Sequence, residues 1–334
     1  MRPRLFLRTT EFLWQEGHTC HATREDALEE ALRMLEVYRN FAENYLAMPV
    51  LTGRKSASEK FAGAVETYPI EAMMQDGKAL QAGTSHLLCQ DFAKAFNIQF
   101  QDKDGTLKYI WPTSWGITTR LIGALVMVHS DDSGLVLPPK IAPTHVVIIP
   151  IVKKDADNAR LMEVCGNIRE GLSGDISVLL DSRDQYTPGW KFNEWEQKGV
   201  PVRIEIGPRD IQSNSVVICR RDTGEKKSYP IDGIEKVVEG LLKEIQTNLF
   251  ERAKKFLAEN TRALDSYEEM KGILKEKNGF IRAFWCGEGG CEARIKDETM
   301  ATIRVIPFDQ PDEMGPCIAC GKPGAHQVIF AKAY

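Results

Sequence analysis

Residues 6–45 read FLRTTEFLWQEGHTCHATREDALEEALRMLEVYRNFAENY. The second half of this stretch predicts a long amphipathic helix, because Thr23 can cap its first turn and apolar residues recur every three or four positions as far as Tyr45. The first half, residues 6–18, predicts a strand that ends in a polar turn at residues 16–18. A strand followed by a covering helix indicates a fold that combines helices with sheet.

The next part of the chain predicts an antiparallel sheet. Between residues 50 and 117, short β-like runs alternate with Gly, Asp and Lys, which is typical of strands joined by turns. These runs are residues 65–73, 78–83, 96–102 and 108–113. A second helix is predicted over residues 120–129, and because its residues are nearly all apolar we expect it to be buried.

A second domain is predicted to begin after the proline-rich residues 137–143, where the backbone is stiff and lacks donors. From there strands and helices alternate, which predicts an α/β domain with a mixed sheet. The expected strands are residues 146–152, 176–180 and 202–206, the expected helices are 156–172 and 188–198, and a hairpin joins 216–221 to 226–230. A long helix over residues 233–264 follows, and Ser266 with Glu269 predicts the capping box of one more helix.

Composition limits the classes of protein that the chain can represent. Its 334 residues are too many for one ordinary domain, and 43% hydrophobic with 27% charged residues is typical of a water-soluble globular protein. No apolar stretch approaches the ~18 residues of a membrane span. The net charge of −4 excludes a uniformly basic coat for nucleic acid, so any RNA contact depends on local basic patches. The N-terminal residues do not resemble a secretory signal, and we expect a cytoplasmic protein.

Four of the eight cysteines, Cys286, Cys291, Cys317 and Cys320, cluster near the C-terminus. Glycine-rich turns beside each pair let four thiolates face one tetrahedral ion, which predicts a structural Zn²⁺ site. Two disulfides or unrelated thiols are the alternative, and so is a site in which His326 replaces one cysteine. Four sulfur ligands leave no open position for water, so the predicted ion stabilises the fold and does not take part in catalysis.

Three polar clusters interrupt segments that otherwise have the composition of a core: residues 7–18, 81–86 and 114–123. Arg120 stands at the head of an apolar helix and needs an anionic partner, for which a phosphate chain is suited. The sequence has no Walker-type loop, Gly-x-Ser-x-Gly elbow or His-Glu-x-x-His helix. For each polar residue taken singly, a structural role is the alternative to a role in ligand binding or catalysis.

The order and wording of these clusters resemble the prolyl-tRNA synthetases, which are class II aminoacyl-tRNA synthetases. The matching phrases are FLRTTEFLWQEGH at residues 6–18, QAGTSH at 81–86, WGITTR at 115–120, HSDDSGLVLPP at 129–139, PGWKFNEWE at 188–196 and GPRD at 207–210. The zinc-type tail resembles the archaeal and eukaryotic branch of that family, whereas the typical bacterial branch carries an editing insertion. The resemblance covers essentially the whole chain.

The resemblance implies an ATP-dependent proline–tRNA ligase with Mg²⁺ beside the nucleotide. It assigns Arg8 and Arg120 to catalysis through contacts with ATP, to which Thr9, Gln81, Thr84 and Thr118 would also bind. The same matches place Trp14, Glu16 and His86 around the proline. The chemistry agrees with this assignment, because a carboxylate that attacks a like-charged α-phosphate needs neutralisation and alignment and no covalent nucleophile.

The resemblance also implies how the chain is divided and which partners it has. Residues 1–142 would belong to the class II catalytic core, 143–245 to an anticodon-binding α/β domain, and 246–334 to a helical linker with the zinc domain. The predicted contacts with tRNA(Pro) are Arg203, Arg209, Arg220, Arg221, Lys226 and Lys227, with a solvated strand edge as the alternative. Trp190 and Trp195 would stack on RNA or pack in the core, and Tyr334 would fold back toward the active site.

The family's motif 1 and the first half of its motif 2 would precede Met1. We therefore expect the sequence to be an N-terminally truncated fragment, or a reading frame begun at an internal methionine, of a protein that forms a homodimer. A truncated, non-catalytic tRNA-binding paralogue is the alternative from another functional class. A synthetase for threonine or glycine is the alternative within the same class.

Overall fold

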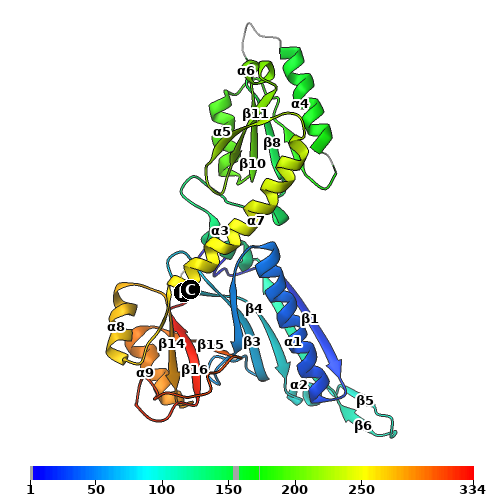
Figure 1. Ribbon diagram of the computed structural model, residues 1–334. Helices are drawn as coiled ribbons and strands as arrows, with labels where there is room; N and C mark the ends of the chain where they lie inside the picture. The colour runs from blue at the N-terminus through cyan, green and yellow to red at the C-terminus, as the bar shows by residue number, and fades with distance from the viewer. Residues whose placement is uncertain (1–2, 153–157, 173) are drawn as a thin grey trace. The chain divides into compact units, whose positions relative to one another are not determined.

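The computed structural model describes residues 3–152, 158–172 and 174–334 (Figure 1). The chain forms two compact units: residues 1–44, 48–128 and 254–334 make the first, and residues 45–47 and 129–253 the second. Within the described ranges, no helix combines the length and the apolar character that crossing a bilayer requires.

The first unit is built on a nine-stranded sheet with the order β1-β7-β4-β3-β2-β15-β16-β14-β13. Its strands are Trp14–His21 (β1), Val50–Arg54 (β2), Ala64–Met73 (β3), Ala79–Leu88 (β4), Trp111–Thr118 (β7), Thr261–Ala263 (β13), Phe280–Trp285 (β14), Thr302–Pro307 (β15) and His326–Ala331 (β16). The five strands from the N-terminal half pair antiparallel throughout, which confirms the predicted antiparallel sheet. β15 pairs with β2, so the strands of the cysteine-bearing tail continue the same sheet.

Helix α1, Arg24–Asn40, packs on this sheet as the sequence predicts (Figure 1). Thr23 caps it by accepting a hydrogen bond from the backbone N–H of Asp26 at 3.1 Å. Small buried residues such as Ala27 and Ala31 let the helix approach closely, and the Ser85 hydroxyl of β4 donates to the Ala31 carbonyl at 2.7 Å. The expected last turn of this helix is a π-helix, Phe41–Tyr45.

Shorter elements complete the first unit. They are helix α2 (Asp91–Ala95), the separate two-stranded hairpin of β5 (Gln99–Gln101) and β6 (Leu107–Tyr109), and helices α3 (Arg120–His129), α8 (Tyr267–Glu276) and α9 (Gly289–Thr299). The predicted cap of α8 is confirmed, because the Ser266 side chain accepts from the backbone N–H of Glu269 at 3.3 Å.

The second unit has a mixed five-stranded sheet with the order β12-β11-β10-β8-β9. Its strands are β8 (Val146–Pro150), β9 (Val178–Leu180), β10 (Val202–Ile206), β11 (Ser215–Arg220) and β12 (Lys226–Pro230). It also has the 3-10 turn Pro139–Ile141, helices α4 (Asn158–Leu172), α5 (Pro188–Gln197) and α6 (Pro208–Gln212), and the part of α7 (Ile234–Glu259) that precedes residue 254. Alternate residues of β8 face opposite layers: Ile148 packs in a core with Leu161 and Val238, while Val147 and Ile149 pack near Phe192 and Trp195. The predicted α/β architecture is thus confirmed.

Several predicted boundaries in the first unit are wrong. Residues 5–7 form a turn, Arg8 makes an isolated bridge with Arg4, and residues 9–13 are irregular. Residues 16–18 lie inside β1, where they pair with β7 and do not make a turn. The expected strand at 96–102 shrinks to β5, because Asn97 adopts a left-handed conformation with φ 54°. The run at 108–113 divides between β6 and β7.

Two of the predicted helices also differ from the structure. The helix expected to reach residue 264 ends at Glu259, where the Asn260 side chain donates to the Phe256 carbonyl at 2.9 Å and residues 261–263 join the sheet. Helix α3 is incompletely buried, since Ile122 is 46% exposed. The predicted start of α4 at residue 156 lies outside the described residues.

Candidate active site

A cavity of about 440 Å³ opens on the first unit. Nine of its lining residues are the ones that the sequence assigned to ATP and proline: Arg8, Thr9, Trp14, Glu16, Gln81, Thr84, His86, Thr118 and Arg120. Strand register explains their convergence. Glu16 of β1 and Thr84 of β4 both pair with Gly116 of β7, so side chains distant in sequence emerge side by side on one face.

The two arginines give the cavity a cationic side. The Arg120 guanidinium is half-buried and donates from Nε to the Leu7 carbonyl at 3.1 Å and from Nη1 to the Gln81 carbonyl at 3.4 Å. Burial lowers the pKa of Arg120, and the nearby Arg8 cation lowers it further. No carboxylate of the described residues forms an ion pair with either arginine, so an anionic ligand is the partner that this arrangement lacks.

His86 and aromatic rings make the other side of the cavity. The His86 ring lies 5.2 Å from the Phe61 ring, and its Nδ1 is 3.0 Å from the Thr67 hydroxyl. Burial lowers the pKa of His86 to about 4, so the imidazole is neutral at pH 7. Glu16 lines the same cavity, and its Oε1 lies 3.2 Å from Nε2 of His18. A neutral imidazole and a carboxylate in one cavity suit a ligand that carries both a cationic amine and an apolar ring.

The indole ring of Trp115 packs closely against the backbone of β1 at Gly17. A Cβ atom added at Gly17 would lie 2.3 Å from the indole of Trp115, so a larger residue there would push the ring away. Trp115 also lines the cavity, although the sequence assigned it no role. The sequence feature that could have identified Trp115 as a cavity residue is its position in the WGITTR motif.

Phe61 was missed as well, and nothing in the sequence indicated it. It lies in the irregular segment before β3 and is 50% exposed. Only the folded structure brings it to the cavity, because its partner His86 is on a different strand.

Tyr334, at the end of the chain, lies against the segment that carries Arg8. Its hydroxyl donates to Asp76, its ring faces the Arg4 guanidinium at 5.5 Å, and Arg4 and Arg8 exchange backbone hydrogen bonds. The structure therefore places Tyr334 beside the cavity-lining N-terminal segment.

The four clustered cysteines meet as predicted, with their sulfur atoms all within 4.8 Å of one another. Sγ of Cys286 is 3.6 Å from that of Cys291 and 3.9 Å from that of Cys320, and no disulfide joins them. A tetrahedral ion with Zn–S bonds of about 2.3 Å requires S–S separations of about 3.8 Å. The donor set thus fits Zn²⁺, and His326 is not part of the group.

Local backbone geometry prepares these thiols to bind a metal. Gly287 and Gly321 adopt left-handed φ values of 87° and 70°, which turn the chain back beside Cys286 and Cys320. Burial opposes ionisation of Cys317, but backbone N–H groups, among them that of Ala319, outweigh it and lower the pKa of this thiol to about 7. Burial and the neighbouring thiols raise the pKa of Cys291.

The predicted tRNA-binding residues do not form a surface of unpaired cations. Ion pairs within the second unit engage four of them: Arg203 and Lys226 with Glu205 at 3.0 and 2.9 Å, Arg220 with Asp222 at 2.8 Å, and Arg221 with Asp131 at 2.6 Å. Arg209 differs, because its side chain is exposed and forms no ion pair with the described residues. Lys227 is exposed and faces the Tyr229 ring at 5.3 Å.

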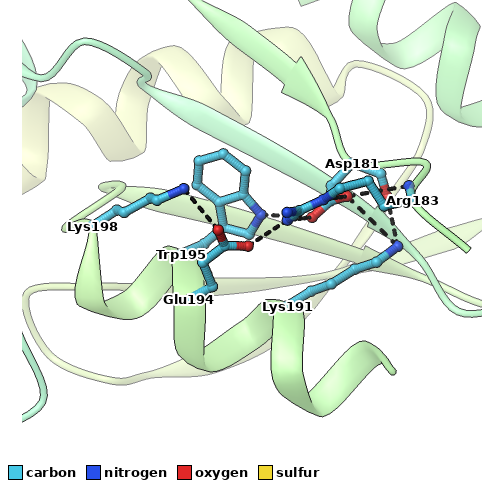
Figure 2. A network of polar contacts seen from close by, with 6 residues as sticks. All are labelled: Asp181, Arg183, Lys191, Glu194, Trp195 and Lys198. Atoms are coloured by element: carbon cyan, nitrogen blue, oxygen red, sulfur yellow. Dashed lines mark hydrogen bonds and ion pairs between the residues drawn. The ribbon is translucent and has the colours of Figure 1, made fainter. Parts of the chain in front are cut away.

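Figure 2 shows a polar network between the end of β9 and helix α5 that the sequence did not reveal. The nearly fully buried Asp181 accepts two hydrogen bonds from the Arg183 guanidinium, at 2.8 and 2.7 Å, and one from the Trp195 indole at 2.8 Å. Burial alone would raise the pKa of Asp181, but these hydrogen bonds hold it well below its usual range. Trp195 is thereby fixed in packing, whereas Trp190 is 42% exposed and stacks on Tyr186 at 3.8 Å.

Three family models match separate segments of the chain. The family described as "tRNA synthetase class II core domain (G, H, P, S and T)" matches residues 4–129, "Anticodon binding domain" matches 145–241, and "Prolyl-tRNA synthetase, C-terminal" matches 267–334. With the antiparallel sheet and its cavity, these matches define a class II aminoacyl-tRNA synthetase.

Individual relatives narrow the assignment. A proline–tRNA ligase of Porphyromonas gingivalis is 57% identical over 335 residues, covering 100% of this chain and 68% of the relative. Those of Prosthecochloris aestuarii and Natranaerobius thermophilus are 56% and 54% identical, covering 100% and 98% of this chain and 70% and 68% of the relative. The chain belongs to the prolyl-tRNA synthetase family. The assignment to the archaeal and eukaryotic branch stays a prediction.

Proposed function

We propose that this chain activates proline with ATP to form prolyl-adenylate and transfers the prolyl group to tRNA(Pro). The observation that supports this most directly is the convergence of Arg8, Gln81, Thr84 and Arg120 on one cavity with His86 and Glu16. These side chains come from two strands, a helix and the N-terminal segment. Strand pairing brings them to one cavity, and the two cations beside polar groups suit a polyanionic ligand.

Each side of the cavity has a part in the proposed reaction. Arg8 and Arg120 neutralise the triphosphate, so that the proline carboxylate can approach the α-phosphate without full charge repulsion. Thr9, Gln81, Thr84 and Thr118 supply polar contacts that align the nucleotide. Gln81 and Thr84 would lie near a Mg²⁺ ion, which would supply positive charge at the phosphates when bound.

The proline site is assigned to Trp14, Glu16 and His86. The Glu16 carboxylate attracts the secondary ammonium of proline, and the neutral His86 does not repel it. Trp14 is 58% exposed and lies edge-on to Phe12 at 6.0 Å between ring centroids, so it offers an apolar surface for the pyrrolidine ring.

We assign tRNA binding to the second unit and a folding role to Zn²⁺ in the C-terminal tail. The division at residues 1–142, 143–245 and 246–334 is part of the same proposal, as are the homodimer of the full-length protein and its place in the cytoplasm. Sedimentation analysis of the full-length protein tests the dimer.

Proline-dependent exchange of pyrophosphate into ATP tests the proposed activation step. The 334-residue chain should catalyse exchange with proline and none with threonine or glycine. Exchange with one of those amino acids would identify another synthetase of the same class. Binding of tRNA(Pro) without any exchange, by this chain and by the full-length protein alike, would identify the non-catalytic paralogue instead.

A further inference from the structure

A buried ionic cluster lies next to the candidate active site and takes no part in the proposed chemistry. Glu71 of β3 is completely buried, and its carboxylate accepts hydrogen bonds from Lys55 at 2.7 Å and from Arg304 at 2.9, 3.1 and 3.2 Å. The side chains of Lys55 and Arg304 are 1% and 9% exposed. A buried cluster of this kind is costly to desolvate, so its presence needs an explanation beyond stability.

The cluster adjoins the residue that we assign to the triphosphate. Glu71 pairs directly with Gln81 of β4, so the two side chains emerge on the same face of the sheet. The Gln81 carbonyl accepts a hydrogen bond from Arg120. The charge of Glu71 attracts Arg120 and that of Arg304 repels it.

Arg304 comes from the C-terminal part of the chain, on β15. Its strand joins the catalytic sheet at β2, where a Cβ atom added at Gly53 would lie 2.1 Å from the Ile306 carbonyl oxygen. Thr302 supports Arg304 by accepting from Nη1 at 3.0 Å. The C-terminal tail therefore delivers one cation to the Glu71 carboxylate, which pairs in register with Gln81.

We propose that Arg304 is a positioning residue for the nucleotide site. Its guanidinium pairs with the Glu71 carboxylate and so prevents this carboxylate from forming an ion pair with Arg120. With both Lys55 and Arg304 on the carboxylate, Arg120 stays directed at the cavity by the Leu7 and Gln81 carbonyls. Without Arg304, the Glu71 carboxylate has one close cation left and pairs with Arg120. This inference rests on the proposed function for the identity of the ligand, ATP.

The test compares ATP and proline affinity in variants of the 334-residue chain by calorimetric titration. Arg304→Gln should weaken ATP binding about tenfold, the loss of roughly one charge-assisted hydrogen bond. Proline binding should change less than about twofold, because His86 and Glu16 do not contact the cluster. Arg304→Lys keeps a cation on Glu71 and should give a smaller loss.

A second substitution separates positioning from a general loss of structure. In the double variant Glu71→Gln with Arg304→Gln no carboxylate can capture Arg120, so ATP affinity should recover toward that of the unchanged chain. Arg282→Gln is the matched control, since Arg282 lies on β14 of the same tail and bonds to Gln327 at 3.2 Å. Thermal unfolding and zinc content of each variant are measured in parallel.

Three results would overturn the inference: unchanged ATP affinity in both Arg304 variants, equal losses for ATP and proline, or a double variant weaker than Arg304→Gln. An unchanged chain that does not bind ATP would overturn it together with the proposed function. An unchanged chain that binds ATP but shows no proline-dependent exchange would refute the proposed function alone.

Discussion

Arg120 shows how one side chain can be held by the backbone and still be available to a ligand. Its guanidinium donates to two carbonyl groups, those of Leu7 and Gln81, and these neutral acceptors fix its direction without cancelling its charge. Arg8 stands on the same cavity from the N-terminal segment. The pair therefore forms a site for a polyanion that is set up before the ligand binds.

Arg120→Gln should lower kcat/KM for proline-dependent exchange about 100-fold or more, because a donor aimed at the developing charge is lost. Arg33→Gln is the control, since Arg33 is exposed on α1 and pairs with Glu29 and Glu30. An Arg120 variant with activity within about twofold of the unchanged chain would contradict the assignment.

His129 should make the stability of the chain depend on pH. It is 2% exposed, its Nε2 donates to the Leu46 carbonyl at 2.8 Å, and burial lowers its pKa to about 4. In the unfolded chain the imidazole of His129 takes up a proton near pH 6.5. The contribution of His129 to stability is therefore fully present above that pH and is lost as the pH falls toward 4. From pH 7 to 5 the free energy of unfolding should fall by about 2 kcal/mol from this group.

Urea unfolding at both pH values measures this loss. The His129→Gln variant should show a pH dependence shallower by that amount, whereas His18→Gln, at an exposed position, should follow the unchanged chain. Equal pH dependence in all three proteins would refute the role of His129.

At the scale of elements, hydrophobic periodicity and caps made the long regular segments predictable. The helix after Thr23, the strand Val202–Ile206 and the hairpin of β11 and β12 follow the sequence closely. The boundaries of the other elements depend on how strands pair in the folded structure. Residues 16–18 have a turn-like composition but lie in β1, because pairing with β7 satisfies their backbone groups.

The zinc-type tail is an element whose stability depends on its four thiols. Cys317→Ser should abolish binding of one Zn²⁺ per chain and lower the melting temperature of the first unit, whose sheet the tail completes, because binding of the ion adds to the free energy of folding. Metal analysis and thermal unfolding measure the two effects. Cys20→Ser is the control at an exposed cysteine outside the group, and an equal zinc content in both variants would rule out the tetrathiolate site.

Two arginines of the second unit should respond differently to substitution. Arg209→Gln should weaken tRNA(Pro) binding, lower the slope of log affinity against log salt by about one, and leave the melting temperature unchanged. Arg221→Gln should lower the melting temperature, because it breaks the ion pair with Asp131 and a hydrogen bond to the Glu196 carbonyl. Filter binding over a salt series measures the tRNA(Pro) affinity of both variants, with Lys236→Gln as a control at an exposed position. An unaltered affinity in Arg209→Gln would show that Arg209 is not part of the tRNA interface.

At the scale of the whole molecule, the sequence predicted which residues share a cavity but not what surrounds them. The nine assigned residues meet because the quoted motifs lie on strands that pair in register. The sequence did not predict the roles of Phe61 or of the cluster formed by Glu71, Lys55 and Arg304. Their contacts join segments up to 249 residues apart and leave no local pattern in the sequence. Long-range ion pairs of this kind follow from the tertiary fold and not from spacing in the sequence.

The most direct test of the site as a whole is a crystal structure of the chain with ATP and proline bound. The triphosphate should lie against Arg8 and Arg120 with Gln81 and Thr84 in contact, and the pyrrolidine ring should lie beside His86 and Trp14. A nucleotide bound elsewhere, with those four side chains facing solvent, would contradict the shared site.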